Sequence, residues 1–125
     1  MISLSIGEGY AFDFLSICEV KLSYAKTKDD KARMAAQFKF YANLIEEQVG
    51  GPKYGAVRAS IEYAKLKDTN KTIFDTINNA KIYTINALTV DSLNIVRFKL
   101  KQEIQRKFFP DKPLNECKLG YKFTK

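Results

Sequence analysis

Apolar side chains recur at intervals of three and four residues along most of this chain, and this spacing constrains its fold more than any other feature. Such spacing places apolar residues on one face of an α-helix, whereas a strand needs alternation and a second strand to pair with. Residues 82–90 are rich in β-branched residues, but no second alternating segment is present. We therefore predict a helix there too, with a break near Thr89, and an all-α protein.

Capping and breaking residues bound the predicted helices. The first helix starts between Ser5 and Tyr10, with a Ser5/Glu8 capping box, and the second has its cap at Thr27 or Asp29 and its stop at Gly50-Gly51-Pro52. A weak helix follows over residues 56–67, and Asp68-Thr69-Asn70 ends it and caps the next helix. The last helix has its cap at Asp91 or Ser92 and its stop at Pro110. The aromatic residues expected in the core are Phe38, Tyr41, Phe74, Phe98 and Phe108. These elements predict a single-domain bundle of four or five helices over residues 1–125, with an extended C-terminal tail, residues 110–125, packed on it.

The composition excludes several kinds of enzyme. A chain of 125 residues has the size of one ordinary domain, and this one contains no histidine. Absence of histidine removes the commonest general base, the usual zinc ligand and the Ser-His and Cys-His dyads. Cys18 and Cys117 lie far apart and form no Cys-x-x-Cys motif. We expect no cofactor and no metal, and Cys18 lies on an apolar stripe where it should be buried.

The sequence also favours one compartment. The N-terminus lacks the features of a signal peptide, no apolar run approaches the length of a membrane-spanning helix, and two free thiols suit a reducing environment. We predict a cytoplasmic protein without a membrane span, located in the host cytoplasm if a phage encodes it.

Charge is distributed unevenly. Before Arg97 the chain has 12 Lys and Arg against 11 Asp and Glu, and from Arg97 onward it has 9 against 3, so almost all of the net charge of +7 lies in the last quarter. A surface of one sign attracts partners of the other sign. The last predicted helix repeats Arg97, Lys101 and either Gln105 or Lys107 at near-helical spacing, with Asn94 one turn earlier. This face could present donors to phosphates, and the alternative is a solvated basic face.

Both ends of the chain carry short motifs shared with a known family. The motifs are Ser5-Ile6-Gly7-Glu8, Phe14-Leu15-Ser16-Ile17-x-x-x-Lys21, Asn94-x-x-Arg97-x-x-x-Lys101-x-x-Ile104 and Leu114-x-Glu116-x-Lys118-x-Gly120-Tyr121. On these residues the chain resembles an uncharacterised family of short all-helical proteins of bacteria, some encoded near glycan-processing genes, and of tailed phages. The family brings no established activity. The resemblance implies a candidate set of polar binding residues, namely Glu8, Lys21, Asn94, Arg97, Lys101, Glu116 and Lys118.

These residues could also form one connected polar set. If the first helix packs on the last, Glu8 or Lys21 could meet Arg97 or Glu116, and buried charges persist only when they are paired. We expect such pairs to fasten the tail to the bundle, so that deletion of residues 111–125 should lower the melting temperature.

Together these observations predict a non-enzymatic helical interaction or adaptor protein whose basic C-terminal quarter contacts an acidic protein partner, with homo-oligomerisation as a further expectation. Two alternatives stay open. The first is a phage or bacterial nucleic-acid-binding accessory protein. The second is a small glycan- or nucleotide-modifying enzyme that uses Glu8 or Glu116 with Lys and Arg.

Overall fold

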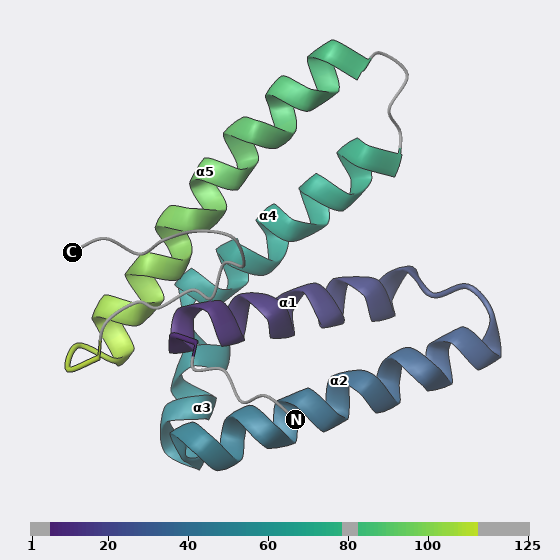
Figure 1. The fold of residues 1–125 in the computed structure, drawn as a ribbon. Coiled ribbons are helices and arrows are strands. Elements are labelled where there is room, and N and C mark those ends of the chain that lie inside the picture. The colour runs from purple at the N-terminus through teal and green to yellow at the C-terminus, as the bar shows by residue number, and fades with distance from the viewer. Residues whose placement is uncertain (1–5, 79–82, 113–125) are drawn as a thin grey trace.

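The computed structural model describes residues 6–78 and 83–112 and confirms the all-α fold (Figure 1). Its helices are α1 (Glu8–Tyr24), α2 (Lys28–Val49), α3 (Gly51–Arg58), α4 (Ile61–Asn78) and α5 (Tyr83–Phe108). The predicted tail packing, and with it Glu116, Lys118 and Cys117, lies outside the described residues.

The first helix is the centre of the arrangement. α1 contacts α2 on one side and α4 and α5 on the other, while α2 packs only on α1 and α3 among the described elements. α4 and α5 run side by side in opposite directions and extend past α1 (Figure 1). Because α1 faces neighbours on several sides, its buried residues are not confined to one stripe. Phe12, Asp13 and Cys18 are all buried although they point in different directions around the helix.

The core lies where α1 meets α2, α4 and α5, and it includes Val57 of α3. Its largest fully buried apolar side chains are Phe12, Leu15, Val57, Leu66 and Ile104. The Phe12 ring contacts three other aromatic rings, those of Tyr54, Tyr63 and Phe109, with centroids 6.0, 6.3 and 6.2 Å away. Aromatic contacts of this kind bury large areas, and they join α1, α3, α4 and the residue after α5.

Gly9 allows α1 and α5 to approach closely. A Cβ atom at this position would lie 2.4 Å from the carbonyl oxygen of Lys101, which is far inside van der Waals contact. The backbone N–H of Gly9 donates a 2.7 Å hydrogen bond to Oε1 of Gln105 at the same crossing. The crossing therefore requires a residue without a side chain.

The three boundaries predicted before residue 51 are confirmed. Thr27 caps α2, because its Oγ1 accepts a 3.0 Å hydrogen bond from the N–H of Asp30. Gly50 ends α2 with a φ of 90°, a left-handed conformation that favours glycine. α1 begins at Glu8, within the predicted interval, although Gly7 is its N-cap residue and Ser5 lies outside the described residues.

The weak helix predicted over residues 56–67 is wrong, because the chain breaks inside it. α3 ends at Arg58 and α4 starts at Ile61. Ser60 makes the break, since its Oγ accepts a hydrogen bond from the N–H of Tyr63 (3.1 Å) and donates one to the carbonyl of Val57 (2.6 Å). The serine thereby caps the new helix and closes the old one.

The stop predicted at Asp68-Thr69-Asn70 is also wrong, since all three residues lie within α4. The threonine hydroxyls of this helix bond back to the carbonyl four residues earlier, at 2.8 Å for Thr69 and 3.0 Å for Thr72. Asn70 is buried against α1. The side chains of Thr69 and Asn70 therefore have hydrogen-bond partners while the backbone stays helical, and Asp68 is exposed.

The predicted break near Thr89 and the cap at Asp91 or Ser92 are wrong too, because α5 is continuous from Tyr83 to Phe108. β-branched residues lower helix propensity by only a few tenths of a kcal/mol each, and packing along α4 outweighs that cost. Phe98, predicted in the core, is exposed, whereas Phe74 stacks on Tyr24 with 4.6 Å between ring centroids. The stop at Pro110 is confirmed within two residues.

Candidate functional site

The buried carboxylate of Asp13 is the centre of a polar network between α1 and α5. Asp13 is 3% exposed. Arg97 binds both of its oxygens, with Nε 2.9 and 3.1 Å from Oδ1 and Oδ2 and Nη2 2.6 Å from Oδ2. Nζ of Lys101 lies 3.7 Å from the same Oδ2. Both oxygens of the carboxylate are therefore paired with cationic groups, which offsets the cost of their burial.

Asn70 of α4 completes this network. Nδ2 of Asn70 donates to Oδ1 of Asp13 (2.9 Å) and to Oγ of Ser16 (2.8 Å), and the Ser16 hydroxyl donates to the carbonyl of Asp13 (2.7 Å). The ammonium group of Lys101 lies 4.1 Å from the centroid of the Tyr10 ring, a cation–π contact. Three helices therefore share one set of hydrogen bonds around a single carboxylate.

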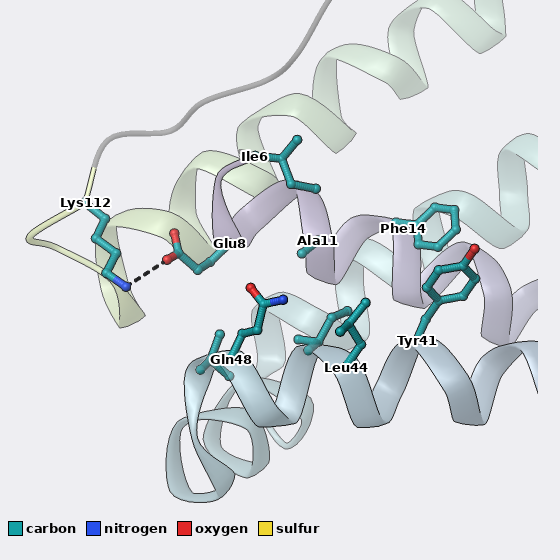
Figure 2. Close-up of a pocket in the computed structure, with 10 residues that line it drawn as sticks. Ile6, Glu8, Ala11, Phe14, Tyr41, Leu44, Gln48 and Lys112 are labelled. Atoms are coloured by element: carbon teal, nitrogen blue, oxygen red, sulfur yellow. Dashed lines mark ion pairs between the residues drawn. The ribbon is translucent and has the colours of Figure 1, made fainter. Parts of the chain in front are cut away.

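A second polar cluster lies at the start of α1. Nε2 of Gln105 donates to Oε1 of Glu8 (2.8 Å), and Nζ of Lys112 lies 3.2 Å from Oε2 of the same carboxylate (Figure 2). Partial burial favours the neutral acid, but the hydrogen bond from Gln105 and the charge and hydrogen bond of Lys112 outweigh it, so the pKa of Glu8 lies below its ordinary value. The cluster fastens residue 112 to the first turn of α1.

A third cluster surrounds Glu19 near the other end of α1. Nη2 of Arg58 lies 2.9 Å from Oε1 of Glu19, and Nζ of Lys67 lies 3.2 Å from Oε2. The Tyr63 hydroxyl donates to the same Oε1 at 2.6 Å, and burial together with this hydrogen bond raises the pKa of Tyr63 far above its ordinary value. The Arg58 guanidinium also lies 5.3 to 5.7 Å from three aromatic ring centroids, those of Phe38, Tyr54 and Tyr63.

An open groove of about 580 Å³ runs between α1 and α2. Figure 2 shows Phe14 and Tyr41 at one end and the Glu8–Lys112 pair at the other. The lining is mainly apolar and comprises Ile6, Ala11, Phe14, Tyr41, Leu44, Ile45 and Val49, with Glu8, Gln48 and Lys112 as its polar members. Ile6, Phe14 and Leu44 are exposed although they are large and apolar.

The structure brings together only part of the predicted residue set. Arg97 and Lys101 share Asp13, and Asn94 lies beside them, with its Oδ1 3.4 Å from Nη1 of Arg97. Glu8 belongs to the separate cluster around Lys112, and Lys21 is exposed on α1. Of the predicted basic face of α5, Lys101 and Gln105 are buried and Arg97 is directed at Asp13, whereas Lys107, the alternative to Gln105, is exposed.

Sequence reasoning missed the residues at the centres of these clusters, namely Asp13, Glu19, Arg58 and Asn70. One signal was available for Asp13, which stands between Phe12 and Phe14 in an otherwise apolar stretch. A charge surrounded by apolar residues on both sides indicates a buried partner. No comparable signal marks Asn70, whose role depends on how α4 packs against α1.

Comparison of the chain with protein-family models, curated proteins and solved structures finds no match to any of them. The resemblance to the bacterial and phage family therefore stays a prediction. Within residues 6–78 and 83–112, no helix has the length and apolar content needed to cross a membrane. In the same part of the chain, no group of three or more Cys, Asp or Glu residues could hold a metal ion.

Proposed function

We propose that this chain is a non-catalytic helical interaction protein that holds an apolar and acidic segment of a partner protein in the groove between α1 and α2. The observation that carries the proposal is the groove itself, in which Phe14, Leu44 and Ile6 remain exposed. Grooves between two helices that expose large apolar side chains suit an amphipathic segment of a partner.

The charge around the groove supports an acidic partner. Lys112 lies at one end with its side chain 61% exposed, and it belongs to the basic last quarter of the chain. Arg106 and Lys107, in the last turn of α5, are also exposed. A carboxylate beside the apolar anchors of a partner would meet the exposed ammonium group of Lys112, which it would share with Glu8. Arg106 is a second exposed cation nearby in the chain, whereas Lys107 is paired with Glu62.

Neither alternative function has equivalent support. The nucleic-acid hypothesis relied on Arg97 and Lys101, whose cationic groups are directed at Asp13. The hypothesis of a small modifying enzyme relied on Glu8 or Glu116. The Glu8 carboxylate is held by Gln105 and Lys112, and Glu116 lies outside the described residues. The groove, in contrast, leaves apolar surface open to a ligand.

Selection of peptides tests the proposal. A phage-displayed library of random linear peptides would be panned against the full chain, and the enriched peptides would be titrated against it by fluorescence anisotropy. We expect peptides with aliphatic or aromatic residues at helical spacing and with Asp or Glu beside them. Their affinity should fall at least tenfold for Leu44→Glu, which places a charge in the groove.

Ile61→Glu is the matched control, because Ile61 is also apolar and exposed but lies at the start of α4 and does not line the groove. Peptides that bind both variants alike would overturn the proposal. A parallel titration with random-sequence oligonucleotides at about 50 and about 200 mM salt separates the alternative, since binding to phosphates weakens steeply over that range. Salt-sensitive oligonucleotide binding together with a failed peptide selection would favour the nucleic-acid function.

A further inference from the structure

The outward face of α5 carries two exposed apolar side chains, one of them at the middle of the helix. Leu88 and Ile95 lie seven residues apart, on the same side of the helix, and are 64% and 58% exposed. The core side of α5 is marked by the buried Leu100 and Ile104. At about 100° per residue, Ile95 and Ile104 point in opposite directions. Ile95 therefore lies at the centre of the solvent-facing side, where polar residues are usual.

Two charged residues flank Ile95 symmetrically. Asp91 lies four residues before it and Lys99 four residues after it, so that all three share one stripe. Both charged residues are exposed, and neither forms an ion pair with another residue in the described part of the chain. Along this stripe an acidic, an apolar and a basic residue therefore follow one another at intervals of four residues. α5 also forms one outer edge of the helical assembly, with α4 and α1 on its other side (Figure 1).

We propose that this stripe binds a second copy of the chain, with two α5 helices packed antiparallel around a twofold axis at Ile95. Such an axis places each residue before Ile95 opposite the residue of the second copy that lies equally far after Ile95. Ile95 then meets Ile95 of the second copy, and Asp91 of each copy meets Lys99 of the other. One helix face therefore supplies an apolar contact and two ion pairs.

Charge complementarity selects a second copy over another partner. A twofold interface uses the same patch on both chains, so the patch must complement itself. Opposite charges at equal distances on either side of an apolar centre meet this condition, whereas two like charges would repel. The surface buried between two single helices is small compared with the roughly 1,200 Å² at the lower end of standard interfaces. We therefore expect a weak dimer whose population rises with protein concentration.

Charge reversal tests the pairing directly. Sedimentation velocity of the full chain over a concentration series should show a reversible monomer–dimer equilibrium. Asp91→Lys places like charges opposite each other, and so does Lys99→Asp, so each variant alone should self-associate at least tenfold more weakly than the wild type. An equimolar mixture of the two variants should restore dimers, because each lysine of one chain then faces an aspartate of the other.

Two further variants separate the interface from general effects on folding. Ile95→Glu should abolish the dimer without changing the melting temperature, because Ile95 is exposed. Ile61→Glu, the matched control on α4, should leave the dimer intact. A wild-type chain that stays monomeric, a dimer that survives Ile95→Glu, or a variant mixture that stays monomeric would each overturn the inference. Loss of the dimer in Leu44→Glu alone would instead place the contact in the groove and would also overturn it.

Discussion

The guanidinium of Arg97 makes three hydrogen bonds to the carboxylate of Asp13, across 84 residues of sequence and between the first and last helices. Asp13 is buried, and Asn70 and Lys101 occupy the remaining space around its oxygens. This contact links the first and last helices, and the pairing offsets the cost of burying the carboxylate.

Asp13→Ala should strongly destabilise the fold. The substitution leaves the Arg97 and Lys101 charges without their shared carboxylate, and breaking a buried ion pair costs about 3–5 kcal/mol. Urea unfolding followed by circular dichroism measures the change in the free energy of unfolding. Asp68→Asn, on the exposed side of α4, serves as the control and should change it by less than about 0.5 kcal/mol. Equal effects of the two substitutions would contradict a buried role for Asp13.

Two glycine substitutions should have opposite effects on stability. Gly9→Ala forces a Cβ atom into the Lys101 carbonyl, so α1 and α5 must separate and the melting temperature should fall. Gly55→Ala, within α3, meets nothing within 4 Å and should gain about 0.5–1 kcal/mol from helix propensity. Thermal unfolding of both variants checks this pair, and a Gly9→Ala protein as stable as the wild type would disprove the close crossing.

Glu8 should make stability depend on pH in the acidic range. Its pKa is lower in the folded chain than the ordinary value of 4.5, because its hydrogen bonds from Gln105 and Lys112 outweigh partial burial. A lowered folded pKa stabilises the native state above the ordinary pKa, and this stabilisation is lost as the pH falls through the folded pKa. Glu8→Gln should therefore be less stable than wild type at pH 7, and the difference should shrink on acidification below about pH 4. Denaturant titrations at both pH values measure it, and a constant difference would rule out this coupling.

Ser60→Ala should weaken the junction of α3 and α4. The variant loses the hydroxyl that caps α4 and should cost about 1 kcal/mol of unfolding free energy. Ser60→Asp keeps an acceptor for the Tyr63 N–H and should retain most of that stability. Chemical denaturation of the two variants gives the comparison, and equal losses would mean that the hydroxyl does not act as a cap.

Local chemistry explains which parts of the fold could be predicted. Thr27 caps α2, and Gly50 ends it, through contacts within a few residues, so the sequence pattern was sufficient. Ser60 uses the same chemistry, but it lies inside a weak apolar stripe that suggested continuity. The polar residues 68–70 were expected to break a helix, because the pattern does not show that Asn70 has a buried partner on α1.

The candidate site was harder to predict than the fold. The sequence suggested that the first and last helices share charged residues, and Glu8, Arg97 and Lys101 do belong to inter-helix clusters. Their partners could not be assigned, because the helix crossing angle decides which residues meet. Placement of Gly9 against Lys101 sets that crossing, and it brings Asp13 rather than Glu8 to Arg97.

The position of Asp13 also has a consequence for synthesis of the chain from its N-terminus. Its side-chain partners Asn70 and Arg97 lie 57 and 84 residues later, so they leave the ribosome long after α1 does. These partners belong to α4 and α5, so α1 and α2 packed together without them leave this carboxylate in contact with water. The nascent N-terminal half therefore keeps Asp13 hydrated, and the core closes only after α5 has been translated.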